Sequence, residues 1–217
     1  MDIGYGCSAG IGGIKYALFV VDRATRNKYI YGLTSLKHDI MPAIKQLVTD
    51  IGRNPGKLVT DYDHKLMGKK ITEYLNDINC KIESAPPKHQ HQNGLVERNW
   101  RSVIRMARSW LNSSLLPSSF WFYAIKRAVE VSNYLPVTLR GQITTPFELA
   151  HHVKPNIQIQ ILLPIFSIAY IDKPSDSNNI RENFANKHHY IFHPMTLDFD
   201  LGNSILTGYN GAVMTTK

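Results

Sequence analysis

The first third of the chain alternates between apolar runs of strand length and a stretch with helical spacing. Lys15–Asp22 and Lys28–Leu33 are rich in aromatic and β-branched residues, and a short polar link separates them, which predicts a β-hairpin. Met1–Tyr5 is a shorter run of the same kind ahead of them. Apolar residues then recur at helical spacing from Ile40 to Ile51, before two glycines and a proline, so we expect a helix that ends there.

The middle of the chain continues the alternation of strands and helices. Lys57–Asp61 and Cys80–Ser84 predict short buried strands, and the stretch from about Leu66 to Ile78 has the apolar spacing of a helix. Ala85–Gly94 has two prolines, a polar interior and a terminal glycine, which predicts a loop. Strands first, followed by strand–helix alternation, are typical of an α/β sheet protein.

Two long helices and a change of pattern follow. The helices are predicted from about Leu95 to Leu111 and from Ser118 to Tyr134. After Pro155 the apolar pieces become short and β-prone; they are Ile157–Tyr170, Tyr190–Phe192 and Ser204–Leu206. We therefore expect an α/β unit over residues 1–156 and a small β-rich appendage over residues 157–217.

Amino-acid composition and net charge restrict the classes of partner that the chain can bind. The chain has 217 residues, of which 43% are hydrophobic, so it can bury a core, and its net charge of +8 favours a polyanion such as nucleic acid as partner. Two cysteines are too few for a Cys-rich zinc module or a disulfide framework. No apolar run approaches the roughly 20 residues of a membrane span, so we expect no membrane partner.

Three acids hold positions that would suit a metal site. Asp2 lies in the first strand, Asp61 ends the Lys57–Asp61 strand, and Glu97 lies in the first turns of the long helix. The chain between Asp61 and Glu97 is long enough to turn the helix back toward that strand. Mg²⁺ takes oxygen ligands, and a pair of ions can activate the attacking oxygen and stabilise the leaving oxygen of a phosphodiester. Spacing alone leaves a structural alternative open, in which Asp61 caps a turn and Glu97 pairs with Arg101.

A specific motif surrounds the third acid. The segment from Pro86 to Arg98 reads PPKHQHQNGLVER, and its Q-N-G-x-x-E-R string resembles the loop and helix of integrases from copia-type retrotransposons. Three further segments resemble that family in the same order: Gly12–Arg26, Phe120–Pro136 and Thr145–Pro155. The resemblance covers residues 1–156.

The resemblance implies a fold, a site and a reaction. The fold would be ribonuclease H-like, a five-stranded mixed sheet flanked by helices. Asp2, Asp61 and Glu97 would be both the catalytic residues and the ligands of two Mg²⁺ ions, with Mn²⁺ able to substitute. The enzyme would be a polynucleotidyl transferase that trims the 3′ ends of the element's DNA and joins them to target DNA. It would act on DNA rather than a small molecule, as a homo-oligomer, in the nucleus after passage through cytoplasmic particles.

Departures from the family pattern motivate a second hypothesis. Around the second catalytic acid the family reads Asp-Asn-Gly-x-Glu-Phe. In this chain Lys65 stands where that string has Glu, and the turn glycine of the string is missing. The alternative is therefore a catalytically decayed or domesticated core that acts as a DNA-binding or assembly module. A ribonuclease H-like nuclease of another lineage would need a fourth acid and would not explain Gln92-Asn93-Gly94. Asp22, at the end of the second strand, is the rival of Asp2 for the first acid, and we favour Asp2.

Basic and polar residues beside Glu97 are candidates for DNA contact. Arg98 and three arginines spaced along one helix face, Arg101, Arg105 and Arg108, could hold a phosphate backbone, although most such charge runs are only solvated faces. The preceding loop adds further DNA-binding candidates, which are Lys88, His89, Gln92 and Asn93. His89 and His91 also allow a zinc hypothesis, which the absence of nearby cysteines disfavours.

Overall fold

The computed structural model describes most of the first part of the chain and four strands of the last part. The described ranges are residues 1–6, 8–60, 68–84, 94–114, 116–139, 141–155, 167–172, 188–193, 205–208 and 213–215. The chain divides into two compact units, Met1–Pro155 and Asn156–Lys217. No helix in these ranges is both long and apolar enough to cross a lipid bilayer.

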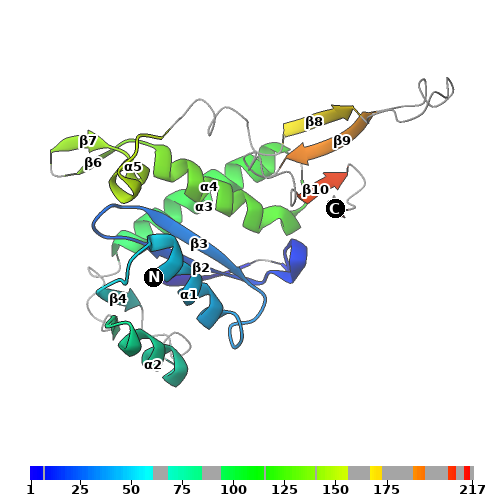
Figure 1. The fold of residues 1–217 in the computed structure, drawn as a ribbon. Coiled ribbons are helices and arrows are strands. Elements are labelled where there is room, and N and C mark those ends of the chain that lie inside the picture. The colour runs from blue at the N-terminus through cyan, green and yellow to red at the C-terminus, as the bar shows by residue number, and fades with distance from the viewer. Residues whose placement is uncertain are drawn as a thin grey trace. The chain divides into compact units, whose positions relative to one another are not determined.

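An antiparallel three-stranded sheet opens the first unit (Figure 1). Its strands are β1 (Asp2–Tyr5), β2 (Tyr16–Val21) and β3 (Lys28–Leu33), in the order β1-β2-β3. Asp2 lies opposite Phe19 in the β1–β2 pair, and a short 3₁₀ helix, Ile11–Gly13, lies between these two strands in sequence. The predicted hairpin and the predicted first strand are confirmed.

Successive residues of β2 face opposite sides of this sheet, as the pleat requires. Leu18 and Val20 join a core with α1 (Ile40–Ile51), whose Ile44 and Leu47 are fully buried. Phe19 points to the other side and stacks on Trp100, with ring centroids 4.7 Å apart. The sheet is therefore covered on both faces, by α1 on one and by the helix that carries Trp100 on the other.

A parallel pair of strands follows α1. β4 (Lys57–Thr60) and β5 (Lys81–Ser84) are joined through α2 (Lys69–Asp77), which adds Ile71 and Leu75 to the same core. The amino group of Met1 donates a hydrogen bond of 2.6 Å to the Val59 carbonyl, so the chain leading into β1 lies beside β4. The ladders that the structure shows in this unit are three-stranded and two-stranded, and a continuous five-stranded sheet stays a prediction.

Two long helices pack against each other and against the three-stranded sheet. They are α3 (Gly94–Ser114) and α4 (Trp121–Tyr134), and Figure 1 shows them crossing over β2 and β3. Gly32 of β3 leaves room for the Phe122 ring of α4, because a Cβ there would come within 2.8 Å of that ring. The residues Ser118–Phe120, which we expect to be α-helical, form a short 3₁₀ turn ahead of α4 instead.

A buried polar contact fixes the start of β3 to the end of α4. The Lys28 N–H donates to Asn133 Oδ1 at 2.9 Å, and Asn133 Nδ2 donates back to the Lys28 carbonyl at 2.9 Å. Lys28 Nζ donates to the Ser132 carbonyl at 3.2 Å. Burial and the neighbouring Arg26 cation lower the pKa of Lys28 to about 8, because both disfavour the charged form.

The end of the first unit contains elements that the sequence analysis missed. A small hairpin, β6 (Val137–Leu139) and β7 (Gln142–Thr144), precedes α5 (Pro146–His151). Thr145 caps this helix, since its side-chain oxygen accepts from the Glu148 N–H at 3.1 Å. The string Thr-Pro-x-Glu carries this helix-start signal, but a helix this short shows little apolar periodicity.

The second unit, taken by itself, contains an antiparallel sheet of four described strands. They are β8 (Ser167–Asp172), β9 (His188–His193), β10 (Ile205–Gly208) and β11 (Val213–Thr215), in the order β11-β10-β9-β8. The strands β9 and β10 contain residues 190–192 and 205–206, which the sequence predicts to be β-prone. That residues 157–217 form a separate appendage remains a prediction.

Candidate functional site

Asp2 lies on the face of the sheet that α3 covers. It is directly opposite Phe19 in the β1–β2 ladder, and residues opposite each other in an antiparallel pair share a face. Phe19 stacks on Trp100 of α3, which identifies that face. Asp2 is half-buried, and its Oδ1 accepts a 2.8 Å hydrogen bond from the Ile3 N–H.

The first turns of α3 lie against the start of β1. Gly4 shares the face of Asp2, and the Trp100 ring fills the space where a Cβ of Gly4 would be. One turn earlier, Val96 is buried and lines the same pocket as Met1. The first turns of α3 and the start of β1 are therefore close to each other, and a joint site of Asp2 and Glu97 stays a prediction.

Glu97 is exposed in the first turn of α3. That position suits a carboxylate, because the unpaired N–H groups of a helix N-terminus favour negative charge. Glu97 therefore presents its carboxylate to solvent at this helix end.

The third candidate acid follows β4. The strand ends at Thr60, which is fully buried, and Asp61 is the next residue in the chain but lies outside the described residues. The Met1–Val59 hydrogen bond brings the end of this strand beside the start of β1. No group of three His, Cys, Asp or Glu side chains forms a metal-binding cluster within the described ranges, from which Asp61 is missing.

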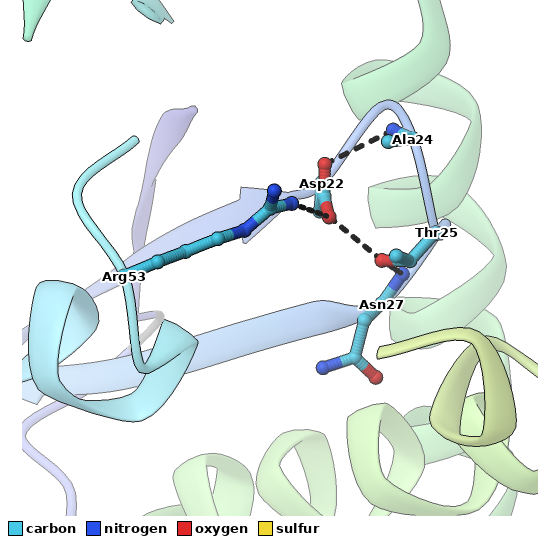
Figure 2. A network of polar contacts seen from close by, with 5 residues as sticks. All are labelled: Asp22, Ala24, Thr25, Asn27 and Arg53. Atoms are coloured by element: carbon cyan, nitrogen blue, oxygen red, sulfur yellow. Dashed lines mark hydrogen bonds and ion pairs between the residues drawn. The ribbon is translucent and has the colours of Figure 1, made fainter. Parts of the chain in front are cut away.

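Asp22 has a structural role in the β2–β3 turn (Figure 2). Its Oδ1 accepts from the Ala24 N–H at 3.0 Å, and its Oδ2 accepts from the Thr25 hydroxyl at 2.8 Å. Arg53 lies 4.0 Å from the same carboxylate. Both Asp22 oxygens are thus engaged in the β2–β3 turn, and the choice of Asp2 over Asp22 as the first acid stays a prediction.

The arginines of α3 form a solvent-facing side of the helix. Arg98, Arg101, Arg105 and Arg108 are all exposed, whereas Val96, Val103 and Ala107 are buried. This agrees with the predicted division of the helix into an apolar and a basic side. The loop candidates Lys88, His89, Gln92 and Asn93 lie outside the described residues, as does His91 of the zinc hypothesis.

A pocket of about 340 Å³ adjoins the start of β1, and no pattern in the sequence predicts it. Met1, Val20, Val21, Val59 and Val96 are among the residues that line it. It arises from the mutual placement of strands that are distant in sequence, which no local pattern encodes.

Comparison of sequences relates the chain to proteins of plant transposons. No family model matches it. It is 26% identical over 153 residues to the retrovirus-related Pol polyprotein from transposon TNT 1-94 of Nicotiana tabacum, an alignment that covers 69% of this chain. It is 29% identical over 147 residues, 66% of this chain, to that from transposon RE2 of Arabidopsis thaliana. The aligned parts are only 11% and 10% of these two relatives.

Comparison of structures relates the fold to retroviral integrases. The HTLV-2 integrase catalytic core domain, solved in complex with magnesium, matches with a TM-score of 0.52 at 16% identity, covering 69% of this chain and 94% of that chain. The BIV integrase catalytic core domain matches with a TM-score of 0.54 at 14% identity, covering 70% and 91%. A simian T-cell lymphotropic virus intasome in complex with PP2A regulatory subunit B56 gamma gives 0.57 at 14% identity, covering 99% and 74%. The chain is thus similar in sequence to transposon Pol polyproteins and in fold to integrase catalytic cores, and the predicted resemblance to a copia-type retrotransposon integrase core is confirmed.

Proposed function

We propose that this chain is the catalytic core of a retroelement integrase, a DNA-joining enzyme in which Asp2, Asp61 and Glu97 hold two Mg²⁺ ions. The observation that carries the proposal is the meeting of β1 and α3, where Val96 and Trp100 pack beside Met1 and Gly4. This packing brings Asp2 and Glu97 to one side of the sheet although they are far apart in sequence. The transposon Pol relatives and the integrase-like fold support the same function.

The proposal includes a single mixed sheet with the order β3-β2-β1-β4-β5. The hydrogen bond from Met1 to Val59 supports it, because it joins the chain at β1 to the edge of β4. In that arrangement β1 is the central strand, and Asp2 lies next to the end of β4, after which Asp61 follows. The three acids would then come from the central strand, its parallel neighbour and the helix that covers them.

The donor atoms fit a hard divalent cation. Carboxylate oxygens are the ligands that Mg²⁺ prefers, and one or two of them together with water and substrate phosphates complete its coordination. Bound in a pair, such ions activate an attacking oxygen and stabilise a leaving one. The role of Asp2, Asp61 and Glu97 is to hold them in place, and the Phe19–Trp100 stack, which joins β2 to α3, keeps the helix against the sheet for this purpose. That the HTLV-2 integrase core was solved with magnesium supports the choice of metal.

The basic side of α3 provides a binding surface for the DNA substrate. Arg101, Arg105 and Arg108 lie on the same face as Glu97 and are exposed, so phosphates held there would run past the acids. Such contacts neutralise backbone charge without reading sequence, and they weaken as salt rises. The loop residues Lys88, His89, Gln92 and Asn93 are proposed to contact the DNA end. We further propose that the chain acts as a homo-oligomer in the nucleus.

Strand transfer of a labelled DNA end tests the enzymatic proposal. With Mg²⁺ or Mn²⁺ we expect joined product from the chain and none from Glu97→Gln, which keeps the size of the side chain but removes its charge. The matched control is Glu73→Gln, because Glu73 is an exposed glutamate on α2 away from the acids. Equal amounts of joined product from both variants would show that Glu97 is not part of the catalytic site.

The alternative is a decayed core that retains only DNA binding, which the substitution at Lys65 and the missing turn glycine favour. Its signature is salt-sensitive DNA binding without joined product from the unmodified chain. Binding itself is tested with Arg105→Ala against Lys70→Ala, an exposed cation on α2. We expect only the α3 variant to reduce the slope of log K against log salt, by about one unit.

A further inference from the structure

A tyrosine on the same strand as Asp2 presents most of its side chain to solvent. Tyr5 is the last residue of β1, and its side chain is 65% exposed. Among the residues that the structure describes, it is the only aromatic one classed as exposed. Single exposed apolar residues are common on protein surfaces, so exposure alone does not assign a ligand to Tyr5. The way in which its backbone is held is the second observation.

Two indole rings hold the backbone on both sides of Tyr5. The Trp100 ring of α3 fills the space beside Gly4 in which a Cβ would lie. The Trp121 ring of α4 does the same beside Gly6, where a Cβ would come within 2.6 Å of the ring. The backbone that carries Tyr5 therefore has little room to move. An exposed ring on a fixed backbone is typical of a binding residue that is ordered before its ligand arrives.

A second tyrosine fixes the orientation of the Tyr5 ring. Ile3 belongs to the core on the α1 side of the sheet, and Tyr5, two residues later, faces the same side. Tyr16 lies directly opposite Tyr5 on β2, and the two rings make a T-shaped contact with centroids 5.4 Å apart. Such a contact occupies at most one face of the Tyr5 ring. The exposure of the side chain leaves room for a flat partner against this ring.

Charge and distance indicate which flat partner suits Tyr5. The chain from Ile3 to Val21 contains no acidic residue, and the exposed Lys15 lies beside Tyr5, since its carbonyl accepts from the Gly6 N–H at 2.9 Å. An anionic partner is therefore not repelled there. Tyr5 follows Asp2 by three residues, about 10 Å along an extended strand. DNA advances about 3.4 Å per nucleotide, so this distance corresponds to about three nucleotides.

We propose that Tyr5 stacks on an unpaired base of the DNA substrate, a few nucleotides from the phosphate held at the acids. This inference rests on the proposed function, because the acids provide the phosphate site. Stacking needs an open base face, which an unpaired nucleotide offers and the interior of a duplex does not. Every base has such a face, so the contact favours unpaired over paired DNA without reading sequence. The arginines of α3 then provide affinity for the backbone, and Tyr5 provides the preference for an unpaired segment.

Fluorescence anisotropy of labelled DNA with the full chain tests the proposal. The two probes are a blunt duplex and the same duplex with a three-nucleotide single-stranded tail, made with either 3′ or 5′ polarity. Tyr5→Ala should weaken binding of a tailed duplex by about tenfold and of the blunt duplex by about twofold or less. Tyr5→Phe keeps the ring and should bind like the wild type. Tyr5→Leu keeps an apolar contact with Tyr16 but has no ring, so it should bind like Tyr5→Ala. The matched control is Ile143→Ala, because Ile143 of β7 is 80% exposed and should not affect either duplex.

Binding is measured without added metal, so the result does not depend on joining activity. Glu97→Gln, which we expect to join no DNA, should keep the preference for the tailed duplex. A chain that joins no DNA but loses this preference in Tyr5→Ala would refute the enzyme and leave the stacking role in place. Equal weakening of tailed and blunt duplexes by Tyr5→Ala, unchanged binding of both tails, or wild-type binding by Tyr5→Leu would overturn the stacking role alone.

Discussion

Lys28 allows a prediction whose size can be worked out from its surroundings. Its side chain is buried, and its pKa is lowered from 10.5 to about 8, with burial as the main cause. The unfolded chain therefore binds a proton more tightly than the folded chain between these two pH values. Stability must rise with pH across that window, because the folded state is relieved of a buried charge. The whole lowering of the pKa corresponds to a change of about 3 kcal/mol in the free energy of unfolding.

The measurement is urea unfolding at several pH values, followed by tryptophan fluorescence, for the wild-type chain and for Lys28→Met. Burial raises the pKa of Tyr29 and of Tyr31, so their ionisation lowers stability at the alkaline end, and the comparison is best made from about pH 7.5 to 9.5. Over this pH range the free energy of unfolding of the wild type should rise by about 2 kcal/mol relative to that of the variant. Loss of the hydrogen bond from Nζ to the Ser132 carbonyl lowers the free energy of unfolding of the variant by the same amount at every pH. Only the slope of the free energy of unfolding against pH therefore tests the prediction. Parallel curves would refute the reasoning.

Three other substitutions have defined outcomes. Gly4→Ala should destabilise the fold by about 1–3 kcal/mol in urea unfolding, because its methyl group overlaps the Trp100 ring, and full stability would contradict that packing. Thr145→Ala should cost about 1 kcal/mol in the same assay through loss of the cap on α5, whereas Thr145→Ser should restore most of it. Asp22→Ala should lower stability by about 1 kcal/mol yet leave strand transfer intact; loss of joined product in a folded variant would return Asp22 to the list of catalytic acids.

Strong local patterns made most of the first unit predictable. The runs that form β2 and β3 combine aromatic and β-branched residues, and α1 and α3 have long apolar stripes, so their types follow from periodicity. The hairpin β6–β7 and α5 were missed because such short elements show little periodicity; the Thr145 cap was their clearest signal.

The site was predictable only in part. Glu97 and its motif are contiguous in the chain, and the basic side of α3 follows from the spacing of its arginines. The turn role of Asp22 depends on contacts with Thr25 and Arg53, and its carboxylate alone could not reveal them. The pocket at Met1 is a product of strand register, which is set by tertiary packing and not by any local run of residues.

The contact between Gly4 and Trp100 has a consequence for the sequences this fold can tolerate. The indole occupies the volume of the missing Cβ, so the two positions share one fixed space. Related chains should therefore vary at these positions together, with a larger residue at one accompanied by a smaller residue at the other. Variants with a single larger residue at either position should therefore seldom fold. Paired substitutions at both positions should fold more often, so the contact between β1 and α3 is best redesigned by changing the two positions together.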